Sequence, residues 1–225
     1  MMNSTSFLVL EMARQIADDP EITTLDNRKY LGIPLANEIR HWLVEQPANC
    51  LFCIDFLGIT AITLSVAEEL GPLLLQTIQQ TPSLEHHYPI YRLNAPEPAY
   101  TIAGVCANFG QSCLAWLPKA AELFPSAFVV ADEGDQVVAV LGQLTAQMGQ
   151  ILRYAERQAQ QRLPLTSEQL TALDFLRSVS PAARSKRLSE LHTRRLLAFR
   201  ENPANYKERL FIPAWRLYEQ RSTAQ

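Results

Sequence analysis

Short apolar runs alternate with segments of helical periodicity along the first 93 residues. The apolar runs at 6–10, 51–56 and 88–93 predict strands, whereas the apolar spacing over 31–44 and 65–78 predicts helices, the second kinked at Pro72. Strands that alternate with helices are typical of an α/β layer whose sheet is at least partly parallel. We therefore predict an α/β domain with a mixed sheet over residues 1–95.

The next region has a weaker pattern. Four prolines punctuate residues 94–125, and no clear period emerges there. Two β-branched runs at 128–131 and 137–140 flank an acidic turn that contains Gly134, which predicts a hairpin. For residues 96–141 three roles stay open: a linker, a dimerisation element, or an extension of the first domain's sheet.

The last third predicts three helices followed by two strands. The helices are expected at 144–160, 166–176 and 180–194, and the strands at 196–199 and 209–212. Thr166 and Gln169 have the spacing of a capping box at the start of the second helix. Ser180 and Pro181 are the residues favoured at the N-cap and at the first position of a helix.

The run SPAARSKRLSELHTRRLL at 180–197, preceded by LTSEQL at 165–170, resembles the winged helix-turn-helix transcriptional regulators. The resemblance implies an α+β winged-helix domain over residues 142–225. The helix at 180–194 would then be its recognition helix, and residues 202–209 its wing. Arg184 stands where that family usually has a small or aliphatic residue, and Arg195 where a glycine often ends the helix.

The charges are divided unevenly along the chain, as is typical of proteins that contact nucleic acid. Residues 1–150 hold 6 basic and 16 acidic side chains, whereas residues 151–225 hold 14 basic and 7 acidic ones. A helix fits the major groove, where polar side chains read base edges, and helix amides and cations bind phosphates. We therefore predict double-stranded DNA as the partner. The expected DNA-binding residues are Ser180, Ser185, Lys186, Arg187, Arg194, Arg195, Arg200, Lys207 and Arg209.

The basic segment is also compatible with two different roles. A charged run can simply be a solvated helix face, and winged helices also dock proteins. The alternative function is therefore a non-enzymatic adaptor in a partner-switching or host-defence complex, which binds proteins through both domains. An enzyme is not expected, because no nucleophile and base occur at a readable spacing.

The segments LFCIDFLGI at 51–59 and ITLSVAEEL at 62–70 resemble a STAS-like domain, over about residues 25–93. The resemblance implies a domain that senses a small ligand or docks a protein, in some members switched by phosphorylation at the strand-to-helix loop. Asp55, Thr63 and Ser65 make up the candidate switch loop. The alternative is structural, with Ser65 as a helix N-cap and Asp55 as a turn former.

Several classes of function are excluded. No glycine-rich phosphate loop, no apolar run long enough for a membrane helix and no secretory signal pattern occurs. Cys50 and Cys53 lie three apart on a predicted strand, so their thiols should point to opposite faces and share no metal ion. We expect no cofactor, no metal and no membrane contact, in a cytoplasmic homodimer whose two-fold symmetry suits paired DNA half-sites.

Overall fold

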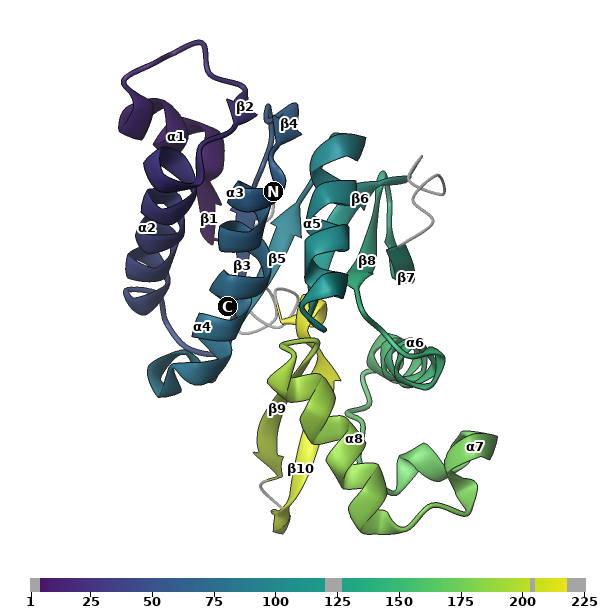
Figure 1. The fold of residues 1–225 in the computed structure, drawn as a ribbon. Coiled ribbons are helices and arrows are strands. Elements are labelled where there is room, and N and C mark those ends of the chain that lie inside the picture. Colours follow the sequence, from purple (N-terminus) through teal and green to yellow (C-terminus); the bar gives the residue numbers. More distant parts are fainter. Residues whose placement is uncertain (1–4, 120–126, 203–204, 218–225) are drawn as a thin grey trace.

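The computed structural model describes residues 5–119, 127–202 and 205–217, with the backbone alone for Thr5 and residues 205–208. A six-stranded sheet crosses the molecule in the order β1-β3-β5-β6-β8-β7 (Figure 1). Its first four strands are parallel: β1 (Thr5–Leu8), β3 (Cys50–Asp55), β5 (His87–Arg92) and β6 (Ser112–Pro118). The hairpin of β7 (Ala127–Glu133) and β8 (Gln136–Gly142) completes the sheet, with β8 antiparallel to both of its neighbours. The predicted mixed α/β class is confirmed.

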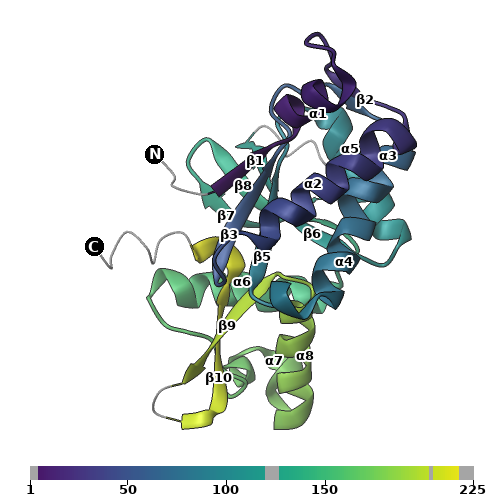
Figure 2. The same cartoon turned by 90° about the vertical axis from the view of Figure 1, so that its left-hand side faces the viewer.

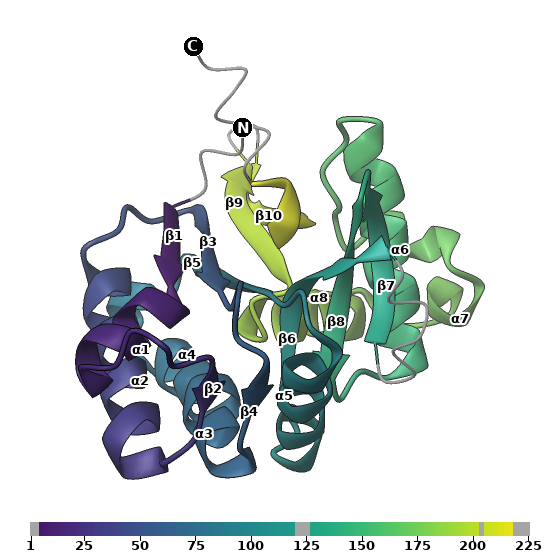
Figure 3. The same ribbon diagram turned by 90° about the horizontal axis from the view of Figure 1, so that it is seen from above.

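Helices of the first half cover one face of this sheet (Figure 3). They are α1 (Val9–Ala17), α2 (Ile33–Val44), α3 (Leu64–Glu68), α4 (Leu74–Gln80) and α5 (Pro96–Asn108). Because the parallel strands lie in chain order, each right-handed crossover places its helix on the same face. A small parallel sheet of β2 (Thr24–Leu25) and β4 (Ala61–Ile62) lies near the carboxyl ends of the parallel strands (Figure 1).

The C-terminal third lies against the other face of the sheet (Figure 3). It consists of α6 (Ala146–Gln160), a 3-10 turn (Gln169–Ala172), α7 (Asp174–Arg177), α8 (Pro181–Thr193) and the antiparallel hairpin of β9 (Leu197–Asn202) and β10 (Asn205–Pro213). A 3-10 turn at Ala214–Arg216 follows β10. Figure 2 shows α7, α8, the end of β9 and the start of β10 at one end of the molecule and β2 at the other.

Two hydrophobic cores lie on the two faces of the sheet. Phe52 and Ile54 of β3 enter the core beneath α2 and α5, and Leu51 and Cys53 enter the core shared with the C-terminal third. Coverage of both faces explains why strand β3 reads as one continuous apolar run. The alternation also places Cys50 and Cys53 in different cores, as predicted.

The second core runs without a break from the sheet into the C-terminal third. Tyr88 and Trp116 of the sheet belong to the same buried cluster as Ile151 of α6, Leu188 of α8 and Trp215. The described part of residues 142–217 therefore folds against the sheet and shares its core with residues of the 51–140 region.

Most predicted elements are present in the structure. The strands at 51–56 and 88–93, the hairpin at 128–140 and the helices at 31–44, 144–160 and 180–194 are confirmed within a few residues. Pro72 falls in a π-helical segment, Glu69–Leu73, that joins α3 to α4 at the predicted kink. The first strand is shorter than predicted, since α1 begins at Val9.

Residues 94–125 hold α5 and β6, which the sequence pattern did not reveal. This region extends the sheet of the first domain, one of the three roles left open, because β6 pairs with β5 on one side and with β8 on the other. Pro96 at the start of α5 and Glu97 in its first turn are ordinary helix-start signals. Because Pro96 and Pro98 lie only two residues apart, the sequence pattern did not indicate a helix in this segment.

The helix predicted over 166–176 is wrong in its length. Its capping box forms, with the Thr166 amide 2.8 Å from Gln169 Oε1 and the Gln169 amide 3.4 Å from Thr166 Oγ1. The chain then breaks at Leu173, whose backbone is extended. Leu170 and Leu176 are both buried, and on one α-helix they would point about 120° apart, so the break lets both reach the core.

Candidate functional site

The start of α8 projects away from the sheet. Ser180 Oγ accepts a hydrogen bond from the Ala183 amide at 3.3 Å, and Pro181 takes the first helical position, as predicted. In Figures 1 and 2 this end of α8 lies at the same end of the molecule as α7, the end of β9 and the start of β10, far from β2 and β4. The elements predicted to approach DNA therefore share one end of the molecule.

Side chains on the first half of α8 differ in exposure. Ser180, Ser185 and Lys186 are exposed. Arg187 is half-buried, and its Nη1 donates to Gln147 Oε1 of α6 at 2.7 Å. Three of the residues predicted to contact DNA are thus exposed to solvent, whereas the side chain of Arg187 is directed toward α6.

Arg184 is buried, although it carries a charge. Its Nε donates to the Ser167 carbonyl at 2.8 Å, and its Nη1 donates to the Val179 carbonyl. Both carbonyls belong to the segment between α6 and α8, so the guanidinium ties that segment together. This accounts for an arginine at a position that the resemblance assigns to an aliphatic residue.

Arg194 was predicted to contact DNA, but its donors are used inside the protein. Its Nη1 lies 3.2 Å from the Gln143 carbonyl, 3.3 Å from Ser112 Oγ and 3.5 Å from the Gly110 carbonyl, and its Nη2 pairs with Glu190 at 3.4 Å. These acceptors lie around the amino end of β6 and the carboxyl end of β8. Arg194 therefore anchors the end of α8 to the sheet.

Arg195 was also predicted to contact DNA, and this prediction is corrected because its side chain is buried and bonded inside the protein. Only 4% of this residue is exposed, and its Nη2 donates to the Ile78 carbonyl of α4 at 3.3 Å. Burial lowers the pKa of its guanidinium. Its φ of 61° is left-handed, the backbone conformation for which a glycine is favoured after a helix. A buried guanidinium beside α4 does not reach a DNA phosphate.

The hairpin carries further basic residues. Arg200 of β9 and Arg209 of β10 are exposed, and the Arg209 guanidinium lies 4.7 Å from the centre of the Phe199 ring. The side chain of Lys207 lies outside the described residues. Together with Lys186, the exposed arginines of the hairpin form what we call the basic end of the molecule: Lys186, Arg200 and Arg209.

Beneath the end of α8 lies a cluster of buried rings. His192 Nδ1 donates to the Leu197 carbonyl at 3.0 Å, and its ring packs edge-on against Phe199 at 4.7 Å and lies 6.1 Å from Tyr88. Burial lowers the pKa of His192 to about 4, and the hydrogen bond to Leu197 opposes this shift. His192 is therefore neutral at physiological pH.

The low pKa of His192 predicts acid sensitivity. The unfolded chain takes up this proton near pH 6.5, but the folded chain takes it up only near pH 4. The contribution to stability is therefore complete above pH 6.5 and is lost as the pH falls to about 4, a change of about 3 kcal/mol in the free energy of unfolding. Urea unfolding at a series of pH values should show a flatter profile for His192→Phe. The exposed His41, changed to Gln, serves as the control, and a His192→Phe profile parallel to the wild type would contradict the prediction.

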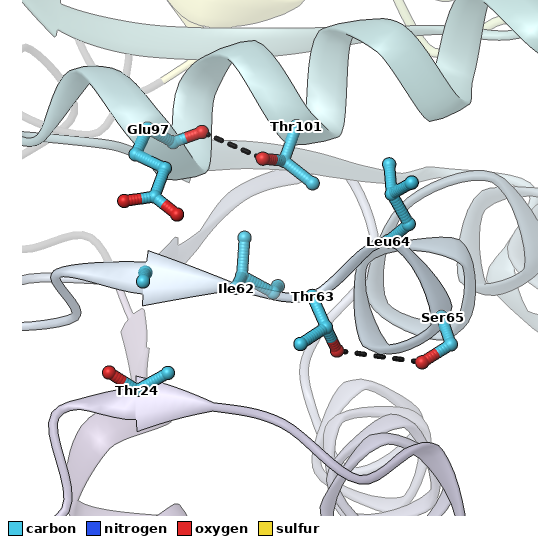
Figure 4. A pocket seen from close by; sticks show the side chains of 8 residues that line it. Thr24, Ile62, Thr63, Leu64, Ser65, Glu97 and Thr101 are labelled. Carbon is cyan, nitrogen blue, oxygen red and sulfur yellow. Dashed lines mark hydrogen bonds between the residues drawn. The ribbon is translucent and has the colours of Figure 1, made fainter.

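The candidate switch loop lies at the opposite end of the molecule. Thr63 and Ser65 line an open pocket of about 640 Å³ between β4, the start of α3 and α5 (Figure 4). Their hydroxyl oxygens are 3.5 Å apart. From α5, Glu97 and Thr101 complete the wall that faces them. The sequence-based prediction missed these two residues because it did not include α5.

Asp55 is separate from this pocket. It is buried at the end of β3, where its Oδ1 accepts the Leu57 amide at 2.9 Å and its Oδ2 pairs with Arg92 at 3.3 Å. The structure thus places Asp55 as a turn former, the structural alternative. Ser65 is not an N-cap, because Thr63 takes that position and makes no capping bond with its side chain.

Metal binding and membrane spanning have no support in the described part of the chain. No group of three or more His, Cys, Asp or Glu side chains there is arranged to hold a metal ion. None of the helices described combines the length and the apolar character that crossing a bilayer requires. Comparison with protein-family models, with curated proteins and with solved structures found no match.

Proposed function

We propose that this protein is a DNA-binding transcriptional regulator, in which a winged helix reads duplex DNA and a STAS-like domain senses or docks. The order α6, α7, α8, β9, β10 agrees with the resemblance to winged helix-turn-helix regulators. The proposed form is a cytoplasmic homodimer that binds two-fold related half-sites. Geometry and charge at one end of the molecule support this function.

The observation that carries this proposal is the solvent-exposed face of the first half of α8. Ser185 and Lys186 face solvent on a helix that projects from the body, and the hairpin beside it adds Arg200 and Arg209. An α-helix fits the major groove, where serine and lysine can hydrogen-bond to base edges. Arginines on an adjacent hairpin suit the flanking phosphates, which orient a protein without reading sequence.

The charge division supports the same orientation. The acidic residues are concentrated in residues 1–150, whose described part forms the sheet, the helices on its far face and the start of α6. Phosphates repel such a surface and attract the basic end, so the protein would bind with the first half of α8 facing the DNA.

Salt dependence of DNA binding by the full-length protein tests the proposal. Affinity for duplex DNA should fall steeply between about 50 and 200 mM salt, because each phosphate contact releases counterions. Changing Lys186 to Gln should weaken binding and, if the ammonium contacts a phosphate, lower the slope of log K against log salt by about 0.9. A weakened affinity with an unchanged slope would assign Lys186 to base reading instead.

The matched control is Lys29→Gln, which removes an exposed lysine from the short π-helical segment Arg28–Gly32 before α2. It should leave both affinity and slope unchanged. Absence of binding at low salt, or equal effects of the two variants, would overturn the proposed function. Binding of a protein partner that Lys186→Gln abolishes, without DNA binding, would favour the adaptor.

A further inference from the structure

The pocket at Thr63 and Ser65 has a defined chemistry. Hydroxyl groups dominate its polar lining, with one carboxylate, from Glu97 (Figure 4). Ile62 and Leu64 provide apolar surface, and 65% of Leu64 is exposed. None of the described residues that line it is basic. Such a lining suits a small neutral or cationic molecule with several hydrogen-bonding groups and disfavours an anion.

Two helical segments that wall this pocket run to the other side of the molecule. The first begins at Leu64 in the pocket and continues through α3, the π-helical segment and α4 to Gln80. The second is α5, whose first turns carry Glu97 and Thr101 and which ends at Asn108. Figure 1 shows both running from the end with β2 and β4 toward the end of α8.

The far ends of both segments are bound by consecutive arginines at the end of α8. The Ile78 carbonyl, in the last turn of α4, accepts from Arg195, and the Gly110 carbonyl, just after α5, accepts from Arg194. Each helical segment thus contacts the pocket at its start and α8 at its end. A displacement of either segment along its axis would act on the α8 anchor.

The π-helical segment Glu69–Leu73 departs from α-helical hydrogen bonding around Pro72, which has no N–H to donate. The Leu74 amide donates to the Glu69 carbonyl, five residues back, instead of to the Leu70 carbonyl as in an α-helix. The Leu70 carbonyl accepts a hydrogen bond from Tyr91 Oη at 2.7 Å. Gly71 of the same segment faces α5, where an added Cβ would lie 3.5 Å from Cys106 Sγ. π-Bulges occur often at functional sites, and this one lies within the first segment where it packs against α5.

We propose that this pocket binds a small neutral or cationic, hydrogen-bonding molecule. Binding of this molecule displaces α4 and α5, which shifts the position of α8 and so changes the affinity for DNA. The regulatory part rests on the proposed function. Arg194 and Arg195 are positioning residues in this scheme, since they act on DNA only by holding α8.

Filling the pocket in the full-length protein tests the coupling. Thr101→Trp places an indole in the pocket from α5, and Thr63→Trp does so from the other segment. Both should change DNA affinity about 5- to 150-fold, the usual range for coupled sites. The slope against salt should stay unchanged, because no phosphate contact is removed. Gly104→Trp is the control, since it lies one turn further along α5 in open space.

Hydrogen exchange separates failure of this coupling from failure of DNA binding. The amides of the last turn of α8 should change their exchange rates in Thr101→Trp and Thr63→Trp but not in Gly104→Trp. If wild-type protein binds no DNA and the exchange still changes, the proposed function fails and the coupling stands. If both pocket variants melt like the wild type and leave α8 exchange and DNA affinity unchanged, the coupling is overturned.

A ligand experiment tests the predicted chemistry with two sugars of opposite charge. The methyl resonances of Thr24, Thr63 and Thr101 are followed while glucosamine or glucose 6-phosphate is added at millimolar concentration. Glucosamine should shift them and glucose 6-phosphate should not. Equal or larger shifts with the phosphate, or no shift with either sugar, would overturn the ligand assignment.

Discussion

Replacing Glu156 by alanine is expected to lower the free energy of unfolding by about 3–5 kcal/mol. Glu156 is 4% exposed on α6, where its Oε2 accepts from Trp215 Nε1 at 2.9 Å and from Arg216 Nε at 3.1 Å. Arg216 Nη2 pairs with its other oxygen, and Arg216 Nη1 pairs with Glu133 of β7 at 2.9 Å. Removal of Glu156 would take away the acceptor of the Trp215 indole N–H and of Arg216 Nε and Nη2, which costs far more than loss of an exposed ion pair.

Denaturant unfolding of the full-length protein checks this expectation. The matched control is Asp174→Ala, which breaks the Asp174–Arg177 pair on α7, where the side chains are 90% and 72% exposed. That change should cost less than about 1 kcal/mol. Similar losses for the two variants would contradict the buried role of Glu156.

The second large effect concerns the C-terminal third on its own. Residues 142–225, produced without the sheet, are expected not to fold. Their core residues, such as Ile151 and Leu188, are buried in one cluster with Tyr88 and Trp116 of the sheet. The fragment would expose this apolar face and lose the acceptors of Arg194 and Arg195 at Gly110, Ser112 and Ile78.

Far-UV circular dichroism and the dispersion of amide NMR signals would test the fragment, with the full-length protein as reference. A cooperative melt and dispersed signals from residues 142–225 alone would contradict this expectation. DNA binding is accordingly best measured with the whole chain, since a negative result from the fragment would report only its unfolding.

Local signals predicted the elements that depend on a few adjacent residues. Ser180 and Pro181 located the start of α8, and the Thr166–Gln169 capping box forms even though the helix behind it is cut short. The apolar run of β3 was recognisable because both faces of that strand are covered. These features need no knowledge of distant neighbours.

The pocket and the anchors of α8 depend on distant neighbours. Thr24, Ser65 and Thr101 come from three separate elements and meet only after the crossovers stack in chain order. No local pattern links them. The Ser65 and Thr63 part of the wall was predicted as a switch loop, whereas α5 was missing from the prediction.

By itself, the sequence determined the alternation of strands and helices, the start of α8, and the surplus of basic residues in the last third. Only the tertiary structure decided which of those residues remain on the surface. Arg184, Arg194, Arg195 and Arg216 lie largely inside, bound to carbonyls and carboxylates. Arg195 reaches an acceptor 117 residues away in the chain. A guanidinium can donate either to a phosphate or to a backbone carbonyl, so the sequence position alone does not distinguish a DNA contact from an anchor.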